Sequence, residues 1–187
     1  MRFLAPLILA VAPAVAFAQV ATEAPAPVKA FEETCLAGGL DPAARPAALT
    51  AAGWTKDAAA TFDTTGFNIS RAIERNFDFS KPDAVEQWSG MVDGKGAKIL
   101  LASFPEKRRY PHLCALIVDG VDNAMPYADS LKNAFKSFGI GRKSVDLVHY
   151  FEFSGKIGVE KHPVRGEVFS RSQVSGDPKS MHIYVAY

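Results

Sequence analysis

The sequence predicts an α+β protein, in which an antiparallel sheet and a few helices occupy separate stretches of the chain. Three observations predict this class. After Pro82 several stretches alternate apolar and polar residues, which is the period of a β-strand. Residues 124–138 have the helical period instead, and two short helical segments precede residue 55. We therefore expect a sheet of about five to six strands, one long helix packed on it and two short N-terminal helices.

The first residues are typical of a secretory leader. Arg2 supplies the positive start, residues 3–15 the apolar core, and Ala16-Phe17-Ala18 a small-residue cleavage site. The apolar stretch is shorter than the roughly 20 residues that span a bilayer, which argues against a membrane anchor. We expect a Sec signal peptide at residues 1–18 cleaved after Ala18, a flexible lead at 19–29, and a single domain at 30–187.

The charge of the expected mature chain is balanced. The full sequence has 21 Lys and Arg against 20 Asp and Glu, and cleavage removes only Arg2. Nucleic acids and anionic membrane surfaces both favour a basic excess, so neither is expected as a partner. We expect a soluble, periplasmic or secreted protein without a membrane span. Its expected partner is a protein or small ligand of the cell envelope.

The protein has two cysteines, Cys35 in "FEETCL" and Cys114 in "HLCALIVDG". In an oxidising compartment a single disulfide is the simplest use of such a pair. A thiol oxidoreductase would have C-x-x-C, a zinc site four closely spaced ligands, and a catalytic Cys an identifiable base, and the sequence presents none of these patterns. We therefore predict a Cys35–Cys114 disulfide, which closes a loop of 114 − 35 = 79 residues.

Two short helices are expected at the start of the domain. In "VKAFEETCLAGG" Phe31 and Cys35 lie at helical spacing, and two glycines supply the stop. "DPAARPAALTAAGW" is Ala-rich, with Asp41 as a candidate cap, and it places Leu49 and Trp54 toward the core.

The strands are expected after Pro82. "AVEQWSGMV" and "AKILLASF" flank a turn with Asp93-Gly94, which is typical of a β-hairpin. "HLCALIVDGV" is almost entirely apolar and predicts a strand in the middle of the sheet. Three further strands are expected in "SVDLVHYFEF", "GEVFSRSQV" and "MHIYVAY". Residues 55–82 fit a helix or an extended segment about equally, so we assign no element to them.

"NAMPYADSLKNAFKSFGIG" is the clearest helix in the sequence. Asp122 or Asn123 can cap its start, and Gly139 can end it. Its apolar stripe is expected to comprise Met125, Ala128, Leu131, Phe135 and Phe138.

The segment "EKRRYPH" concentrates positive charge. Lys107, Arg108 and Arg109 are candidate anion-binding residues, because guanidinium groups suit carboxylates and phosphates. A solvated loop is the competing interpretation, and the balanced total charge favours it. "DGKGAK" lacks the spacing of a phosphate-binding loop, so a hairpin turn is the better interpretation.

The four histidines, His112, His149, His162 and His182, are too far apart to form a local metal or catalytic motif. His149 alternates with apolar residues, so we expect a buried, hydrogen-bonded histidine there. His182 shares one face of the last strand with Tyr184. The G-x-S-x-G and S-x-x-K motifs of common hydrolases do not occur. We assign no catalytic residue, metal ligand or cofactor.

A leader followed by "FEETC" and "AALTAAGW" resembles a group of small exported Gram-negative bacterial proteins without known activity. The resemblance covers about the first third of the chain. It implies export and the early cysteine, and it implies no active site. We expect a non-enzymatic binding or accessory module of the cell envelope. The alternative is a small periplasmic hydrolase whose Ser, His and acidic side chains come together only in the fold.

Overall fold

The computed structural model describes residues 23–37, 41–60, 81–137, 140–147, 150–157, 162–170 and 179–187. The helical elements in these ranges are α1 (Ala26–Phe31), the π-helical turn η1 (Glu32–Leu36), α2 (Arg45–Ala51), the 3₁₀ turn η4 (Met125–Tyr127) and α3 (Ala128–Ser137). The strands are β1 (Thr55–Lys56), β2 (Ala84–Val92), β3 (Lys95–Ser103), β4 (His112–Asp119), β5 (Ile140–Leu147), β6 (Tyr150–Ile157), β7 (His162–Ser170) and β8 (Ser180–Ala186).

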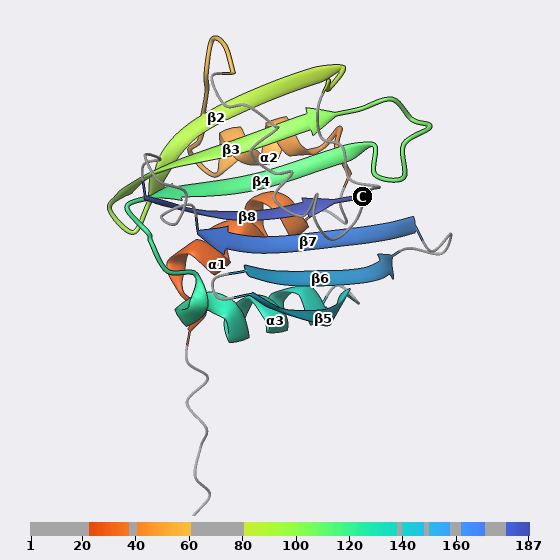
Figure 1. The fold of residues 1–187 in the computed structure, drawn as a ribbon. Helices are drawn as coiled ribbons and strands as arrows, with labels where there is room; N and C mark the ends of the chain where they lie inside the picture. Colours follow the sequence, from red (N-terminus) through yellow and green to blue (C-terminus); the bar gives the residue numbers. More distant parts are fainter. Residues whose placement is uncertain are drawn as a thin grey trace, which may run out of the picture.

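Within the described ranges the strands form one antiparallel sheet, in the order β1-β2-β3-β4-β8-β7-β6-β5 (Figure 1). The chain builds one half of this sheet with β2, β3 and β4. It then crosses through α3 to the far edge and returns strand by strand to β8, beside β4. The helices α1, α2 and α3 lie against one face of the sheet (Figure 1). The predicted α+β class is confirmed, and the eight strands described exceed the predicted five to six.

Local sequence explains the first half of the sheet. The hairpin of β2 and β3 turns at Asp93 and Gly94, whose φ angles of 52° and 71° are those of the predicted tight turn. The strand β4 lies in the interior of the sheet, as predicted, and both of its faces are buried. Cys114, Leu116 and Val118 face the helices, whereas Leu113, Ala115 and Ile117 belong to a second apolar cluster. A strand buried on both faces needs an almost wholly apolar sequence.

The disulfide between Cys35 and Cys114 is present, as predicted, with the two Cα atoms 5.5 Å apart. Cys35 lies on η1 and Cys114 on β4, and both are fully buried. The bond therefore attaches the N-terminal helical segment to the centre of the sheet.

The long helix differs from the prediction at its start. Asn123 Oδ1 accepts a hydrogen bond from the backbone N–H of Met125 at 2.9 Å, so the cap is placed as expected. The first turn, which contains a proline, is 3₁₀ and is therefore more tightly wound than the α-helix that follows. As a result Met125 falls outside the apolar stripe and is 49% exposed, which corrects its predicted burial. Leu131 and Phe135 are buried as predicted, and Phe138 lies outside the described residues.

Two predicted boundaries also change. Helix α1 begins at Ala26, inside the segment 19–29 predicted as a flexible lead, because Pro27 suits a first turn and Val28 packs into the core. The stretch "SVDLVHYFEF" was predicted as one strand, but it is divided between β5 and β6, which pair antiparallel. Apolar and polar residues alternate in both parts of this stretch, so the period alone does not reveal where one strand ends and the next begins.

Candidate binding site

The candidate site lies at the end of the sheet where β2, β3, β4 and β8 come together. The register places Ala84, Ser103 and His112 in one row across β2, β3 and β4. His112 and Tyr187, which follows β8, extend that row by exchanging two backbone hydrogen bonds of 3.0 Å. Side chains two residues apart on a strand share a face, so Glu86 stands beside this row.

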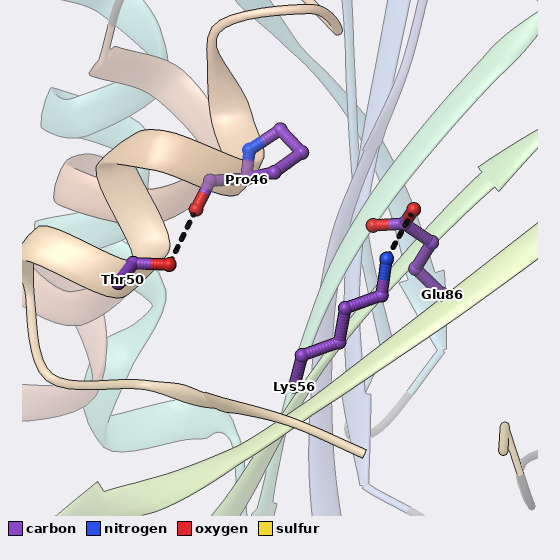
Figure 2. Close-up of polar contacts among 4 residues, drawn as sticks. All are labelled: Pro46, Thr50, Lys56 and Glu86. Atoms are coloured by element: carbon purple, nitrogen blue, oxygen red, sulfur yellow. Dashed lines mark hydrogen bonds and ion pairs between the residues drawn. The ribbon is translucent and has the colours of Figure 1, made fainter. Parts of the chain in front are cut away.

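A cavity of about 190 Å³ lies between this row and the start of α2. We call it the Arg45 cavity. Figure 2 shows Pro46 of α2 and Glu86 of β2 turned toward each other, one from the helix and one from the sheet. Its apolar lining includes Pro42, Pro46, Ala84 and Leu101. Its polar lining residues are Arg45, Glu86, Ser103, His112 and Tyr187.

Arg45 occupies the first position of α2 and is only 3% exposed. Its Nε donates a hydrogen bond to Tyr187 Oη at 2.9 Å, and its guanidinium carbon lies 5.3 Å from the centre of the Tyr187 ring. Its Nη1 donates to the backbone carbonyl of Thr34 at 2.7 Å. Carbonyls near the end of a helical turn lack partners within the turn, so this bond satisfies an acceptor of η1. Arg45 thus links α2, η1 and the end of the sheet.

The third nitrogen of the Arg45 guanidinium, Nη2, differs from the other two because it donates no hydrogen bond to a described residue. Nη2 is buried and has no hydrogen-bond acceptor in the described part of the chain. No carboxylate of the described residues forms an ion pair with Arg45 either. A buried charge is costly unless it is paired and hydrogen-bonded, and among the described residues Arg45 is stabilised by hydrogen bonds and the Tyr187 ring but by no carboxylate.

His112 and Tyr187 complete this end of the cavity. Their rings lie 5.5 Å apart between centres. Burial lowers the pKa of His112 below its ordinary value of 6.5, and the nearby positive charge of Arg45 lowers it further, whereas Glu106 acts in the opposite direction. Burial raises the pKa of Tyr187 above 10.0, and Arg45 opposes that increase. At neutral pH both rings are therefore uncharged, and Arg45 supplies the positive charge here.

Glu86 gives the β2 side of the cavity the opposite character. Its Oε1 lies 2.7 Å from Lys56 Nζ, in an ion pair between β1 and β2 (Figure 2). Its Oε2 is buried and has no hydrogen-bond donor among the residues described. In α2, the Thr50 hydroxyl donates to the Pro46 carbonyl at 3.0 Å, a bond that is internal to the helix (Figure 2). Among the residues described, Arg45 Nη2 and Glu86 Oε2 are thus each buried without a hydrogen-bond partner.

The predicted anion-binding residues lie elsewhere, in the loop between β3 and β4. The guanidinium carbon of Arg108 is 5.3 Å from the centre of the Phe104 ring, and that of Arg109 is 5.4 Å from the Tyr110 ring. Lys107 is exposed. The two guanidinium groups thus stack on different rings, and anion binding by this loop stays a prediction.

Sequence reasoning missed most of the cavity residues. Arg45 is the only charged residue between Asp41 and Lys56, and a lone cation in an Ala-rich helix was the one available signal. Glu86, Ser103 and Tyr187 carry no motif, because only the strand register brings them together.

The other histidines lie away from the cavity or outside what the structure describes. His182 is fully buried with its Nε2 2.8 Å from Ser180 Oγ, on the sheet face opposite the cavity and alongside Tyr184, as the alternation predicts. His149 lies outside the described residues.

The comparisons with known proteins identify no relative. No family model, no curated protein and no solved structure matches this chain. Among the residues that the structure describes, no three His, Cys, Asp or Glu side chains are grouped so that they could hold a metal ion. The described helices are all too short or too polar to cross a membrane. A functional proposal therefore has to start from the Arg45 cavity itself.

Proposed function

We propose that this protein is an exported, non-enzymatic binding module that takes a small molecule into the Arg45 cavity. The observation that carries the proposal is the cavity itself, which combines apolar lining residues with polar ones at the end of the sheet. The volume of about 190 Å³ is large enough for a small ring with one substituent, since a cavity of roughly 150 Å³ binds benzene.

A fragment screen tests this function. Small neutral, cationic and anionic fragments would be added to the ¹⁵N-labelled mature protein, and shifts of amide resonances recorded. We expect saturable shifts centred on the residues around Arg45. Ala84→Phe would fill the cavity from β2 and abolish these shifts, whereas Met91→Phe, at an exposed site of the same strand, would leave them unchanged. A library without any hit at the cavity would refute the function.

Export is the second part of the proposal. The leader at residues 1–18 supports it, and so does the Cys35–Cys114 disulfide, which is consistent with an oxidising compartment. We expect a mature chain that begins at Gln19 and is recovered in the periplasmic fraction. Intact-mass measurement of protein expressed with its own leader checks this, and a product that retains Met1 or stays in the membrane fraction would contradict it.

A hydrolase is the second candidate, because Ser103 and His112 are opposite each other in the register and both line the cavity. A serine nucleophile is normally activated by a hydrogen-bonded histidine. No hydrogen bond between these two side chains is found within the described structure, which favours binding over catalysis. Hydrolysis of p-nitrophenyl acetate that exceeds the buffer rate and is lost in Ser103→Ala, but not in Ser89→Ala, would reverse this choice.

A further inference from the structure

We propose that Met91 and Met125 are sites of reversible oxidation, at which a hydroperoxide converts the thioether to a sulfoxide while the protein stays folded. Met181, in contrast, is protected by the fold. This modification is independent of the proposed binding function. Met91 lies near the end of β2 opposite to Ala84, which lines the Arg45 cavity.

The methionines of the described residues differ sharply in exposure. Met91 is 67% exposed and Met125 is 49% exposed, whereas Met181 is fully buried. Among the residues described, Met91 and Met125 are the only large hydrophobic side chains on the surface, and both carry the oxidisable sulfur. Met91 is opposite Gly96 of β3, which has no side chain to pack against it. Both thioethers are therefore open to a small oxidant in solution.

The protection of Met181 follows from its place in the sheet. It lies on β8, between β4 and β7 in the strand order. It pairs with Val118 of β4, and both belong to the apolar cluster on the face that the helices cover. An oxidant reaches this sulfur only when the core opens, and a sulfoxide oxygen formed there would be a polar group in apolar surroundings.

The reaction needs only the thioether and the peroxide. The sulfur lone pair forms an S–O bond to one peroxide oxygen, the O–O bond breaks, and the proton on the transferred oxygen moves to the departing one. Sulfur is oxidised by two electrons to the sulfoxide, and hydrogen peroxide is reduced to water. At Met91 and Met125 the polar product stays in water, so the fold loses little. Methionine sulfoxide reductases return such sulfoxides to thioethers.

The test is peptide mapping by mass spectrometry after hydrogen peroxide is added to the folded, disulfide-bonded mature protein. We expect Met91 and Met125 each to gain one oxygen at least about tenfold faster than Met181. In urea, where the core is open, all three should react at rates within about threefold of one another. Met91→Leu should remove one added oxygen and leave the oxidation of Met125 unchanged, and Met125→Leu should do the converse.

Reversibility is tested on the oxidised protein. Its melting temperature should stay within about 2 °C of the untreated value, because changes at exposed side chains have small effects on stability. The pair of sulfoxide reductases that act on the two sulfoxide epimers should remove both oxygens. Oxidation of folded Met181 as fast as Met91 would overturn the assignment, and so would protection of Met91 or Met125 relative to the urea-unfolded chain. An oxidised protein that unfolds, or that the reductases do not restore, would overturn reversibility.

Discussion

Arg45 shows how one side chain can serve the fold and the site together. Two of its nitrogens satisfy an oxygen on Tyr187 and one on Thr34, which come from sequence positions far apart. The same bonds hold the guanidinium rigidly beside the cavity, so a ligand would not have to order a flexible side chain before binding. Arg45 therefore contributes a fixed positive charge to the lining of the cavity.

The pH dependence of stability provides a test at the scale of His112. Its pKa is lowered in the folded protein, mainly by burial and then by Arg45, so the folded state binds fewer protons than the unfolded state just below pH 6.5. The free energy of unfolding should therefore fall as pH falls through 6.5. It should fall less in His112→Gln, and urea unfolding of both proteins between about pH 5 and pH 8 measures the difference. Parallel pH profiles would show that His112 does not carry this effect.

At the scale of elements, α3 packs on the sheet through one aromatic residue, Phe135. The Phe135 ring stacks on Phe153 of β6 with the ring centres 4.3 Å apart, and it lies 5.5 Å from the Phe31 ring of α1. The same ring also covers Gly166 of β7. Phe135 therefore joins two helices to two strands, and the helix depends on this contact because its ten residues are too few for independent stability.

Truncation of this aromatic ring should be costly. Phe135→Ala is expected to lower the free energy of unfolding by about 3–5 kcal/mol, since Phe135 is fully buried and its removal leaves a cavity. Lys136→Ala, at the exposed next position of α3, serves as the control and should change stability by less than about 0.5 kcal/mol. Chemical denaturation measures both. Equal losses would mean that the helix presents a different face to the sheet.

Gly166 tests the same contact from the strand side. A Cβ atom at this position would lie within 2.4 Å of the Phe135 ring and 3.1 Å from the Tyr184 carbonyl oxygen. Gly166→Ala should therefore destabilise the protein by about 1–3 kcal/mol or more through overpacking.

A double-mutant cycle checks this explanation. In the Gly166→Ala background Phe135→Leu should cost less stability than it costs alone, because the smaller side chain makes room for the new methyl group. Gly96→Ala is the matched control, since its closest neighbour is a side-chain oxygen of the exposed Asp119, which can move. Additive losses in the cycle would exclude the proposed clash.

At the scale of the whole molecule, the disulfide and the sheet order act together. The sheet places β8 beside β4, so its two halves meet at the strand that carries Cys114. The bond to Cys35 then fixes η1, and with it Thr34, over this junction. The N-terminal segment, the sheet centre and the wall of the cavity are thereby connected through a few covalent and hydrogen bonds.

Removal of the disulfide should lower global stability. Replacement of both Cys35 and Cys114 by Ala is expected to reduce the free energy of unfolding by about 2–4 kcal/mol, because the bond closes a long loop in the unfolded chain. Thermal and urea unfolding measure this loss, and non-reducing peptide mapping should recover one linked peptide pair. Two thiols that react freely with a maleimide in natively exported, folded protein would contradict the disulfide.

Much of the fold could be predicted because its determinants are local. The Asp93-Gly94 turn, the apolar run of β4 and the stripe of α3 each lie within one short stretch. The disulfide could be predicted from the expectation of an oxidising compartment together with the count of two cysteines. The first turn of the long helix was misplaced because the 3₁₀ winding of η4 shifts Met125 off the stripe, and this change of period is too short to read from the sequence.

The sequence by itself determined the class of fold, the disulfide and the interior place of β4, since each depends on composition, period or residue count. Only the tertiary structure decided the site. The strand register brings Glu86, Ser103 and His112 to one end of the sheet, and α2 then places Arg45 over them. Arg45 and Tyr187 are 142 positions apart, yet they are joined by a hydrogen bond. No local pattern encodes such a contact, because it arises from the packing of a helix onto strands that pair across the whole chain.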